Sequence, residues 1–393
     1  MNNRTIFLIA FIYCLFAAYY MFAKDKIISE IIAIEKQRII PIAERYLLEI
    51  PITITAFHCE RSAGGTHDFY SEGDYWWPDP DNPDAPYIQR DGMTNPQNIT
   101  AHRKVLIRFS LHVATLTSAY KLTNDIKYAQ KAIEHLLAWF VNPDTKMNPN
   151  LLYAQAIKGR VTGRGIGIID TIHLIEISQS IMILEKAGIL KGNDLNAIKK
   201  WFRDYLEWLT THQYGIDEMN AKNNHGTCWV MQAAVYAKLV GDSSKIEFCR
   251  KRFKEVLLPN QMDKDGSFPL ELARTKPYNY SLFNLDAMTT ICQILSTNQD
   301  NLWNFTLPDG RGIKKAIDFM YPYILDKSKW PYRHDVMYFD EYPVRQPSLL
   351  FGGLAYNEYK YIDLWKTLKA DPSNEEVIRN LPIRHPILWI NTD

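Results

Sequence analysis

The stretch LNAIKKWFRDYLEWL, residues 195–209, places apolar side chains three or four positions apart, at Leu195, Ile198, Phe202, Leu206 and Leu209. This spacing predicts an amphipathic helix with a single apolar face. The stretch CWVMQAAVYAKL, residues 228–239, follows the same spacing. Amphipathic helices joined by short connections are typical of stacked helical hairpins.

Outward from this region, helical periodicity continues almost to the end of the chain. Further helices are predicted near residues 25–48, 101–120, 126–140, 168–187, 244–257, 285–292, 311–325 and 358–369. Turn signals such as Asn142-Pro143 and Pro308-Asp309-Gly310 separate them, and no long alternating strand pattern is present. We therefore predict an all-α protein. Stacked hairpins can close into an (α/α) toroid, although the pattern alone does not give closure.

Residues 50–100 differ from the rest of the chain in composition, because they are rich in turn residues, aromatic side chains and acids. Prolines recur from Pro78 to Pro96 and exclude a long helix there. We expect a long structured loop, and such loops often carry function. Its Tyr75, Trp76 and Trp77 can form a stacking wall or a lid for a sugar, or can simply hold the loop in place.

Composition narrows the class of protein. The chain has 393 residues, of which 47% are hydrophobic and 23% charged, and a formal net charge of +1. These values predict a globular protein and give no strongly basic face for nucleic acid. Cys59, Cys228, Cys249 and Cys292 form no CxxC pair, so we expect buried small side chains and no metal site.

The N-terminus resembles a targeting segment. Arg4 precedes an apolar run from Ile6 to Ala23, which Lys24 follows. This pattern predicts a cleaved export signal, with an uncleaved membrane anchor as the alternative. We expect residues 1–23 to be that segment, residues 24–393 to form one domain, and the protein to be periplasmic or otherwise exported. Contact with a membrane is expected only if the segment is retained.

A first candidate site is NNHGTCW, residues 223–229, just before a predicted helix. A helix N-terminus attracts carboxylates and disfavours imidazolium, which would keep His225 neutral and able to accept a proton. Asn223 and Asn224 could help to bind such a carboxylate, and Glu218 lies seven positions earlier. The plainer alternative is a capping Asn followed by a structural His.

A second candidate site contains Arg274, Lys276, Tyr278 and Tyr280. Arg274 and Lys276 could bind an acidic substrate, since Arg grips a carboxylate at two points. A phenol in that positive field would have a lowered pKa and could shuttle a proton. A surface Arg beside packed Tyr side chains is the alternative.

A third candidate is the basic turn at residues 158–167, which contains Arg160 and Arg164. Its glycine spacing is not a dinucleotide fingerprint, because no βαβ context surrounds it. The turn could line an anion-binding cleft or could be a solvated loop.

Together these segments resemble the alginate lyase domain family. The Asn-Asn-His-Gly-x-x-Trp run and the Arg-x(5)-Tyr-x-x-Phe run are similar to the two catalytic segments of helical-toroid uronate lyases. The loop HDFYSEGDYWWPDP, residues 67–80, resembles a subgroup that includes glucuronan lyases and mannuronate-directed alginate lyases. The likeness covers about residues 60–355. In some members the Arg-to-Tyr spacing is seven rather than the six found here. Arg274 therefore matches the family's pattern less closely than Tyr280 does.

The resemblance implies an (α/α) toroid without metal or cofactor, with Asn224, His225 and Tyr280 in the catalytic positions. Tyr280 is preferred over Tyr278 because it stands three residues before Phe283. The substrate-binding candidates are Arg274, Glu218, Asn223, Arg160, Arg164, Tyr75, Trp76, Trp77 and Lys276.

The expected reaction is β-elimination of a 4-linked acidic polysaccharide, which leaves a C4=C5 unsaturated uronate. Two alternatives remain at this point. A glycoside hydrolase on a similar toroid would use two carboxylates, such as Asp74, Glu72, Glu218 or Asp286. A glycan-binding protein without activity would keep the aromatic loop and need neither His225 nor Tyr280.

Overall fold

A computed structural model describes the backbone of residues 3–391 and the side chains of residues 24–391. Helices account for 59% of the structure and strands for 4%, which confirms the all-α prediction. The side chains of the expected export segment, residues 1–23, lie outside the described part, so that segment stays a prediction.

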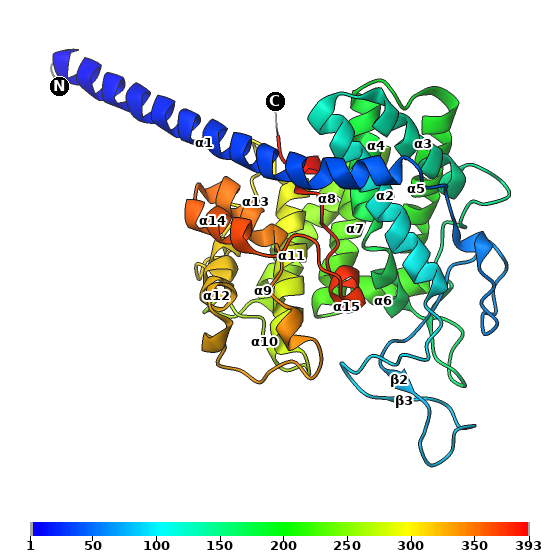
Figure 1. The fold of residues 1–393 in the computed structure, drawn as a ribbon. Helices are drawn as coiled ribbons and strands as arrows, with labels where there is room; N and C mark the ends of the chain where they lie inside the picture. Colours follow the sequence, from blue (N-terminus) through cyan, green and yellow to red (C-terminus); the bar gives the residue numbers. More distant parts are fainter. Residues whose placement is uncertain (1–2, 392–393) are drawn as a thin grey trace.

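Five helices follow one another in space around the interior: α2 (Ala101–Thr123), α4 (Leu174–Lys186), α7 (Asn224–Val240), α11 (Pro277–Leu295) and α13 (Pro347–Tyr356). Each contacts the next, and the side chains of α7 and α11 are almost all buried. These five form the inner layer of the (α/α) toroid (Figure 1).

The outer layer pairs with the inner one to form hairpins. Its helices are α3 (Ile126–Phe140), α5 (Gly192–Thr211), α8 (Ser243–Arg252), α12 (Ile313–Leu325) and α14 (Tyr359–Thr367). Short helices α6 (Gln213–Met219), α9 (Leu258–Gln261), α10 (Pro269–Leu272) and α15 (Glu375–Arg379) lie in the connections. The sequence patterns located most of the long helices, whereas α13 and α15 were not among the predicted segments.

The long helix α1 (Asn3–Tyr46) runs across the body from the α14 side to α2 (Figure 1). The buried carboxylate of Glu35 pairs with Arg38 at 2.6 Å and with Arg345 at 3.1 Å, and Glu30 pairs with Lys366 of α14 at 2.7 Å. These ion pairs join α1 to the C-terminal part of the chain, and α1 also packs against α2 of the first hairpin.

The predicted aromatic loop is present between α1 and α2. It contains the strands β1 (Tyr70–Glu72), β2 (Trp76–Trp77) and β3 (Ile88–Gln89), and a fourth strand, β4 (Tyr153–Ala156), follows α3. β1 pairs in parallel with β4, while β2 and β3 form an antiparallel hairpin that projects from the body (Figure 1). These strands of two to four residues were too short to leave an alternating pattern.

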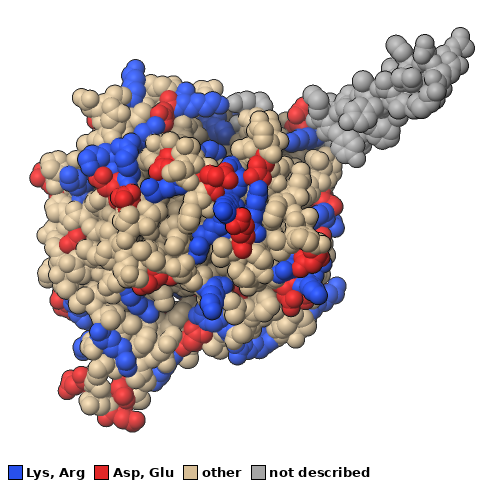
Figure 2. Space-filling model, turned by 180° about the vertical axis from the view of Figure 1, so that it is seen from behind, with Lys and Arg blue, Asp and Glu red and all other residues tan. Residues whose placement is uncertain are grey.

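Two further features concern the chain as a whole. Cys59, Cys228, Cys249 and Cys292 are buried free thiols, as expected. Within the described range no single helix could cross a membrane, although the bent pair Gly165–Thr171 and Leu174–Lys186 passes the length and composition test together. Figure 2 shows both signs of charge interspersed over one face of the molecule.

Candidate active site

A cleft of about 360 Å³ opens where the aromatic loop meets the inner helices. Its walls come from the β1–β3 region, the 3₁₀ helix η2 (Gly165–Thr171), the first turns of α7 and α11, and the segment after α15. The polar and aromatic lining includes Asp74, Tyr75, Trp76, Gln89, Asp91, Gln155, Arg164, Asp170, Asn223, Asn224, His225, Arg274, Tyr280, Phe283, Arg379 and Asn380. A concave site with a few convergent polar groups is the usual form of a ligand site.

His225 occupies the first turn of α7, where Asn223 is the N-cap and its side chain accepts from the His225 backbone N–H. The capping interpretation is thus confirmed, and the functional one stays a prediction. The Nδ1 atom of His225 lies 2.6 Å from Oε1 of Glu218, a buried residue of α6. A carboxylate there accepts a hydrogen bond from Nδ1–H. The neutral imidazole then has its unprotonated nitrogen, Nε2, on the other side of the ring, where it can accept a proton.

Asn224 is fixed by Glu271 of α10. The Asn224 backbone N–H donates to one Glu271 oxygen at 2.6 Å, and its side-chain amide donates to the other at 2.7 Å. Burial raises the pKa of Glu271, although the two hydrogen bonds oppose this. The amide of Asn224 therefore has one defined orientation and one remaining N–H.

Tyr280, on the first turn of α11, donates a hydrogen bond of 2.8 Å to the hydroxyl of Tyr75. The guanidinium of Arg274 lies 4.7 Å from the centre of the Tyr280 ring. Burial nevertheless raises the pKa of Tyr280 well above its ordinary value, and the positive field of Arg274 only opposes this. The prediction of a lowered phenol pKa was therefore wrong, because desolvation outweighs the nearby charge.

Arg274 is already engaged. Its guanidinium holds Asp91 with bonds of 2.7 and 3.2 Å, and Thr275 donates to the same carboxylate at 2.8 Å. Partial burial would raise the pKa of Asp91, but the bonds from Arg274 and Thr275 bring it below its ordinary value. The pair lines the cleft as a neutral unit, so the charge of Arg274 is largely compensated before any substrate arrives.

Arg164 differs from Arg274, because its bonds go to neutral groups. Its Nε and Nη2 donate at 3.0 Å to the backbone and side-chain oxygens of Gln155. Among the described residues no carboxylate forms a salt bridge with Arg164. The guanidinium also lies 5.8 Å from the Trp76 ring centre, which gives the cleft a cation beside an aromatic wall.

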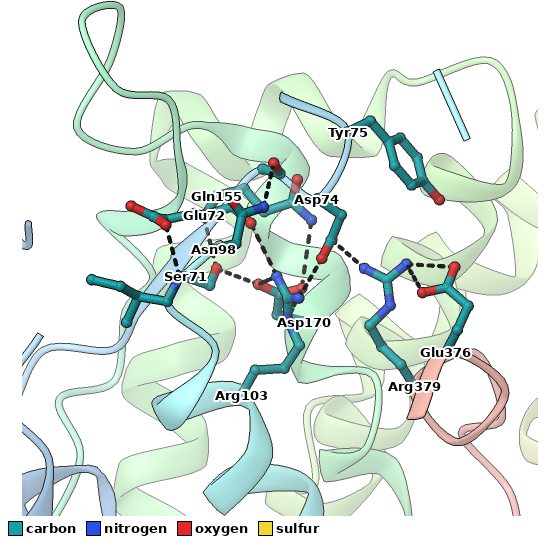
Figure 3. Close-up of polar contacts among 12 residues, drawn as sticks. Ser71, Glu72, Asp74, Tyr75, Asn98, Arg103, Gln155, Asp170, Glu376 and Arg379 are labelled. Atoms are coloured by element: carbon teal, nitrogen blue, oxygen red, sulfur yellow. Dashed lines mark hydrogen bonds and ion pairs between the residues drawn. The ribbon is translucent and has the colours of Figure 1, made fainter. Parts of the chain in front are cut away.

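At the floor of the cleft, a row of buried charges alternates in sign (Figure 3). Arg103 contacts Asp74 at 2.6 Å and Asp170 at 3.2 Å, and Asp74 also contacts Arg379 of α15. Arg379 in turn pairs with Glu376 at 2.9 Å. Because each charge has a partner of opposite sign, the row ties the aromatic loop, α2, η2 and α15 together at the floor of the cleft.

The structure brings most of the candidate residues together. Tyr75, Trp76, Arg164, Asn223, Asn224, His225, Arg274 and Tyr280 line the cleft, with Glu218 directly behind His225.

Three substrate-binding candidates are not among the residues that line the cleft, and burial contradicts the prediction only for Lys276. Lys276 is completely buried and pairs with Glu376 at 2.6 Å. The indole N–H of Trp77 donates to the backbone of Met93, and Nε of Arg160 donates to the backbone of Tyr87 at 2.6 Å. Lys276 is therefore shielded from solvent, and the polar groups of the other two already bond to the loop itself.

Sequence reasoning missed Glu271, Asp91, Gln155 and Arg379. Glu271 carried a signal, since it is a single acid within the apolar run Phe268-Pro-Leu-Glu-Leu. Gln155 and Arg379 carried none, because their approach to the cleft depends on the pairing of β1 with β4 and on the path of the C-terminal segment.

The carboxylates named for a hydrolase are engaged in structural roles. Asp74 is held by Arg103 and Arg379, and Glu72 is held by Arg61 at 2.6 Å. Asp286 lies in the core, where burial raises its pKa to about 7. Of the four acids named for a hydrolase, Asp74 is the one among the described residues that line the cleft, whereas a hydrolase would need two carboxylates there.

A helical toroid whose cleft holds an imidazole, an amide and a phenol defines the class of polysaccharide lyases. The chain belongs to the alginate lyase family, whose model matches residues 53–330.

Solved structures agree with this assignment. The chain resembles an alginate lyase from Bacteroides ovatus with 32% identity and a TM-score of 0.79, over 93% of this chain and 97% of that one. Alginate lyase A1-III from Sphingomonas species A1 shares the fold, with 13% identity, a TM-score of 0.55 and coverage of 89% and 93%. No protein in the curated set matches the sequence.

Proposed function

We propose that the protein cleaves a 4-linked uronic-acid glycan by β-elimination. The glycan is either mannuronate-rich alginate or glucuronan. The products would carry a C4=C5 unsaturated uronate at the non-reducing end. The observation that carries the proposal is the convergence of His225, Asn224 and Tyr280 on one cleft that also contains Arg164.

Substrate binding follows from the charges in the cleft. The carboxylate of a uronate needs a cation that is not already paired, and Arg164 fits better than Arg274 because its partners are neutral. The remaining amide N–H of Asn224 can donate to the same carboxylate. Neutralising that carboxylate makes the proton on C5 easier to remove, since the charge that develops is stabilised.

The two rings can then carry the proton transfers. In mannuronate and glucuronate the C5 proton and O4 lie on the same face of the sugar. Tyr280 can therefore remove the proton from C5 and donate a proton to O4. In guluronate they lie on opposite faces, and His225 would act as base while Tyr280 acts as acid. We favour the first substrate class, in which Tyr280 must first be deprotonated.

Other solved relatives support an oligosaccharide ligand. A histidine-to-alanine variant of alginate lyase A1-III was solved in complex with a tetrasaccharide, with 14% identity to this chain and a TM-score of 0.56. We infer that an acidic oligosaccharide or polysaccharide occupies the cleft here.

We also propose that residues 24–393 form one lyase domain and that residues 1–23 direct export, which would place the enzyme in the periplasm or outside the cell. The ion pairs of Glu30, Glu35 and Arg38 with the C-terminal hairpin support the assignment of α1 from residue 24 onward to that domain.

The test is an ultraviolet absorbance assay with polymannuronate, polyguluronate and glucuronan, because the C4=C5 bond absorbs and a hydrolysis product does not. We expect absorbance to rise fastest with polymannuronate or glucuronan. Chain shortening without a rise in absorbance would indicate a hydrolase, and binding without chain shortening would indicate a glycan-binding protein.

A further inference from the structure

Lys276 lies beneath the two phenols of the cleft. Its ammonium nitrogen is 5.0 Å from the centre of the Tyr75 ring and 5.3 Å from that of Tyr280. At these distances a cation interacts favourably with both rings. The side chain is fully buried, so its charge is not screened by water and acts on these neighbours rather than on solvent.

Glu376 of α15 holds Lys276 in this place. Its carboxylate accepts from Lys276 at 2.6 Å, from Arg379 at 2.9 Å and from the side chain of Asn380 at 3.2 Å. Burial would raise the pKa of Glu376, but Arg379 and Lys276 lower it to about 2. Burial also opposes the charge on Lys276, yet Tyr75 and Glu376 raise its pKa above the ordinary value. The pKa of each group is therefore shifted in the direction that favours its charged form.

The reaction proposed above requires a phenolate at Tyr280. Burial disfavours that form, so the enzyme needs a compensating charge close to the ring. Each nearby cation has a carboxylate partner: Arg274 pairs with Asp91, Arg379 with Asp74 and Glu376, and Lys276 with Glu376, so their positions relative to the rings distinguish them. Lys276 is the cation that lies under both phenols at once.

We propose, on the basis of the proposed function, that Lys276 is a positioning residue that stabilises the Tyr280 phenolate, and that Glu376 of α15 sets the strength of this effect. The geometry assigns to the C-terminal segment, beyond the residues that match the family, control over the ionisation of the catalytic phenol.

The proton balance is simple. One proton leaves Tyr280 for solvent, and the hydroxyl of Tyr75, which lies 2.8 Å away, rotates to donate to the phenolate. In the reaction the phenolate takes the C5 proton, the C4–O4 bond breaks as the C4=C5 bond forms, and the new phenol gives its proton to O4. Lys276 keeps its own protons throughout.

Other charged and titratable groups near the phenols or Lys276 also affect this equilibrium. They are Arg274 and Asp91 beside Tyr280, Arg379 and Tyr342 beside Tyr75, and Asp335 and Tyr338 beside Lys276. None of them is replaced in the two variants below. Glu376→Gln also removes one partner of Arg379, a second cation, so its effect on the phenols has the same sign through Lys276 and through Arg379.

The experiment compares the pH dependence of kcat/KM in two variants that change charge in opposite senses. Lys276→Met removes the cation, so the rising limb of the profile should move to higher pH by at least about one unit. Glu376→Gln removes the anion and retains an acceptor for Lys276, so the limb should move to lower pH. A purely structural role would not reverse the sign between the two.

The neighbouring surface pair Lys104 and Glu375 provides a matched control. Its salt bridge of 2.9 Å is exposed, and Glu375 stands beside Glu376 on α15. Lys104→Met and Glu375→Gln should leave the limb where it is in the wild type. If Lys276→Met does not fold, Lys276→Arg replaces it in the comparison. Lys276→Arg keeps the positive charge and should show the wild-type pH profile, whereas Glu376→Gln should still shift the rising limb to lower pH.

Limbs that coincide with the wild type in both variants, or that move in the same direction, would overturn the inference. A wild-type enzyme that yields no unsaturated product would instead overturn the proposed function. In that case NMR titration of isotope-labelled Tyr280 still tests Lys276, because the same opposite shifts are expected without turnover.

Discussion

The hydroxyl of Tyr280 donates a 2.8 Å hydrogen bond to the hydroxyl of Tyr75, which joins α11 to the aromatic loop across 205 positions of sequence. The contact brings the proposed acid and base into a wall that the loop completes.

Replacement of Tyr280 by Phe removes the proton-transfer group and keeps the ring. We expect kcat to fall by about 10²–10⁴-fold with KM within a few-fold of the wild type. Initial rates at several substrate concentrations measure both. Tyr278→Phe is the matched control, because its hydroxyl bonds to the backbone of Tyr323, and this variant should keep its activity. Near-normal turnover of Tyr280→Phe would refute its role.

Replacement of Glu218 by Gln tests the orientation of His225. A neutral amide no longer favours the proton on Nδ1, so the fraction of His225 with a free Nε2 acceptor should fall. We expect activity on polyguluronate, where His225 is the proposed base, to fall at least about tenfold more than activity on polymannuronate. Asp217→Asn, at the exposed neighbouring position, serves as control. Equal losses on both polymers would argue against His225 as a substrate-dependent base.

Arg164 should govern affinity for the uronate carboxylate. Arg164→Gln is expected to raise KM about tenfold or more, because one charge-assisted contact is worth about 1.5–3 kcal/mol. It should also weaken the dependence of KM on salt. Exposed Arg203→Gln should change neither quantity. An unchanged KM in Arg164→Gln would move the carboxylate site elsewhere in the cleft.

Asp286 should make stability depend on pH. Burial raises its folded-state pKa to about 7 from 3.8, so the folded state binds this proton more tightly than the unfolded state. The resulting stabilisation is complete below about pH 4 and is lost as the pH rises through about 7. In thermal melts, the Tm of the wild type should fall between pH 5 and 8 by at least about 2 °C more than the Tm of Asp286→Asn. Parallel curves for the two proteins would contradict this assignment, and exposed Asp194→Asn is the control.

The sequence was sufficient for the helical class and for the main members of the site. The apolar spacing at residues 195–209 reflects α5 directly, and the NNHGTCW run marks the start of α7 because a capping Asn has a local signature. Arg379 and Gln155 reach the cleft only through tertiary packing, which periodicity does not encode. Lys276 was predicted to bind an acidic substrate, whereas its pairing with Glu376, 100 positions later, accompanies its burial, and no local pattern encodes that pairing.

The most direct test of elimination is the mass of the products from a defined mannuronate oligosaccharide. Elimination splits the chain without adding water, so the fragment with the new non-reducing end should be lighter by one water than its hydrolysis counterpart and should absorb ultraviolet light. Fragments with the full hydrolysis mass and no absorbance would contradict the account.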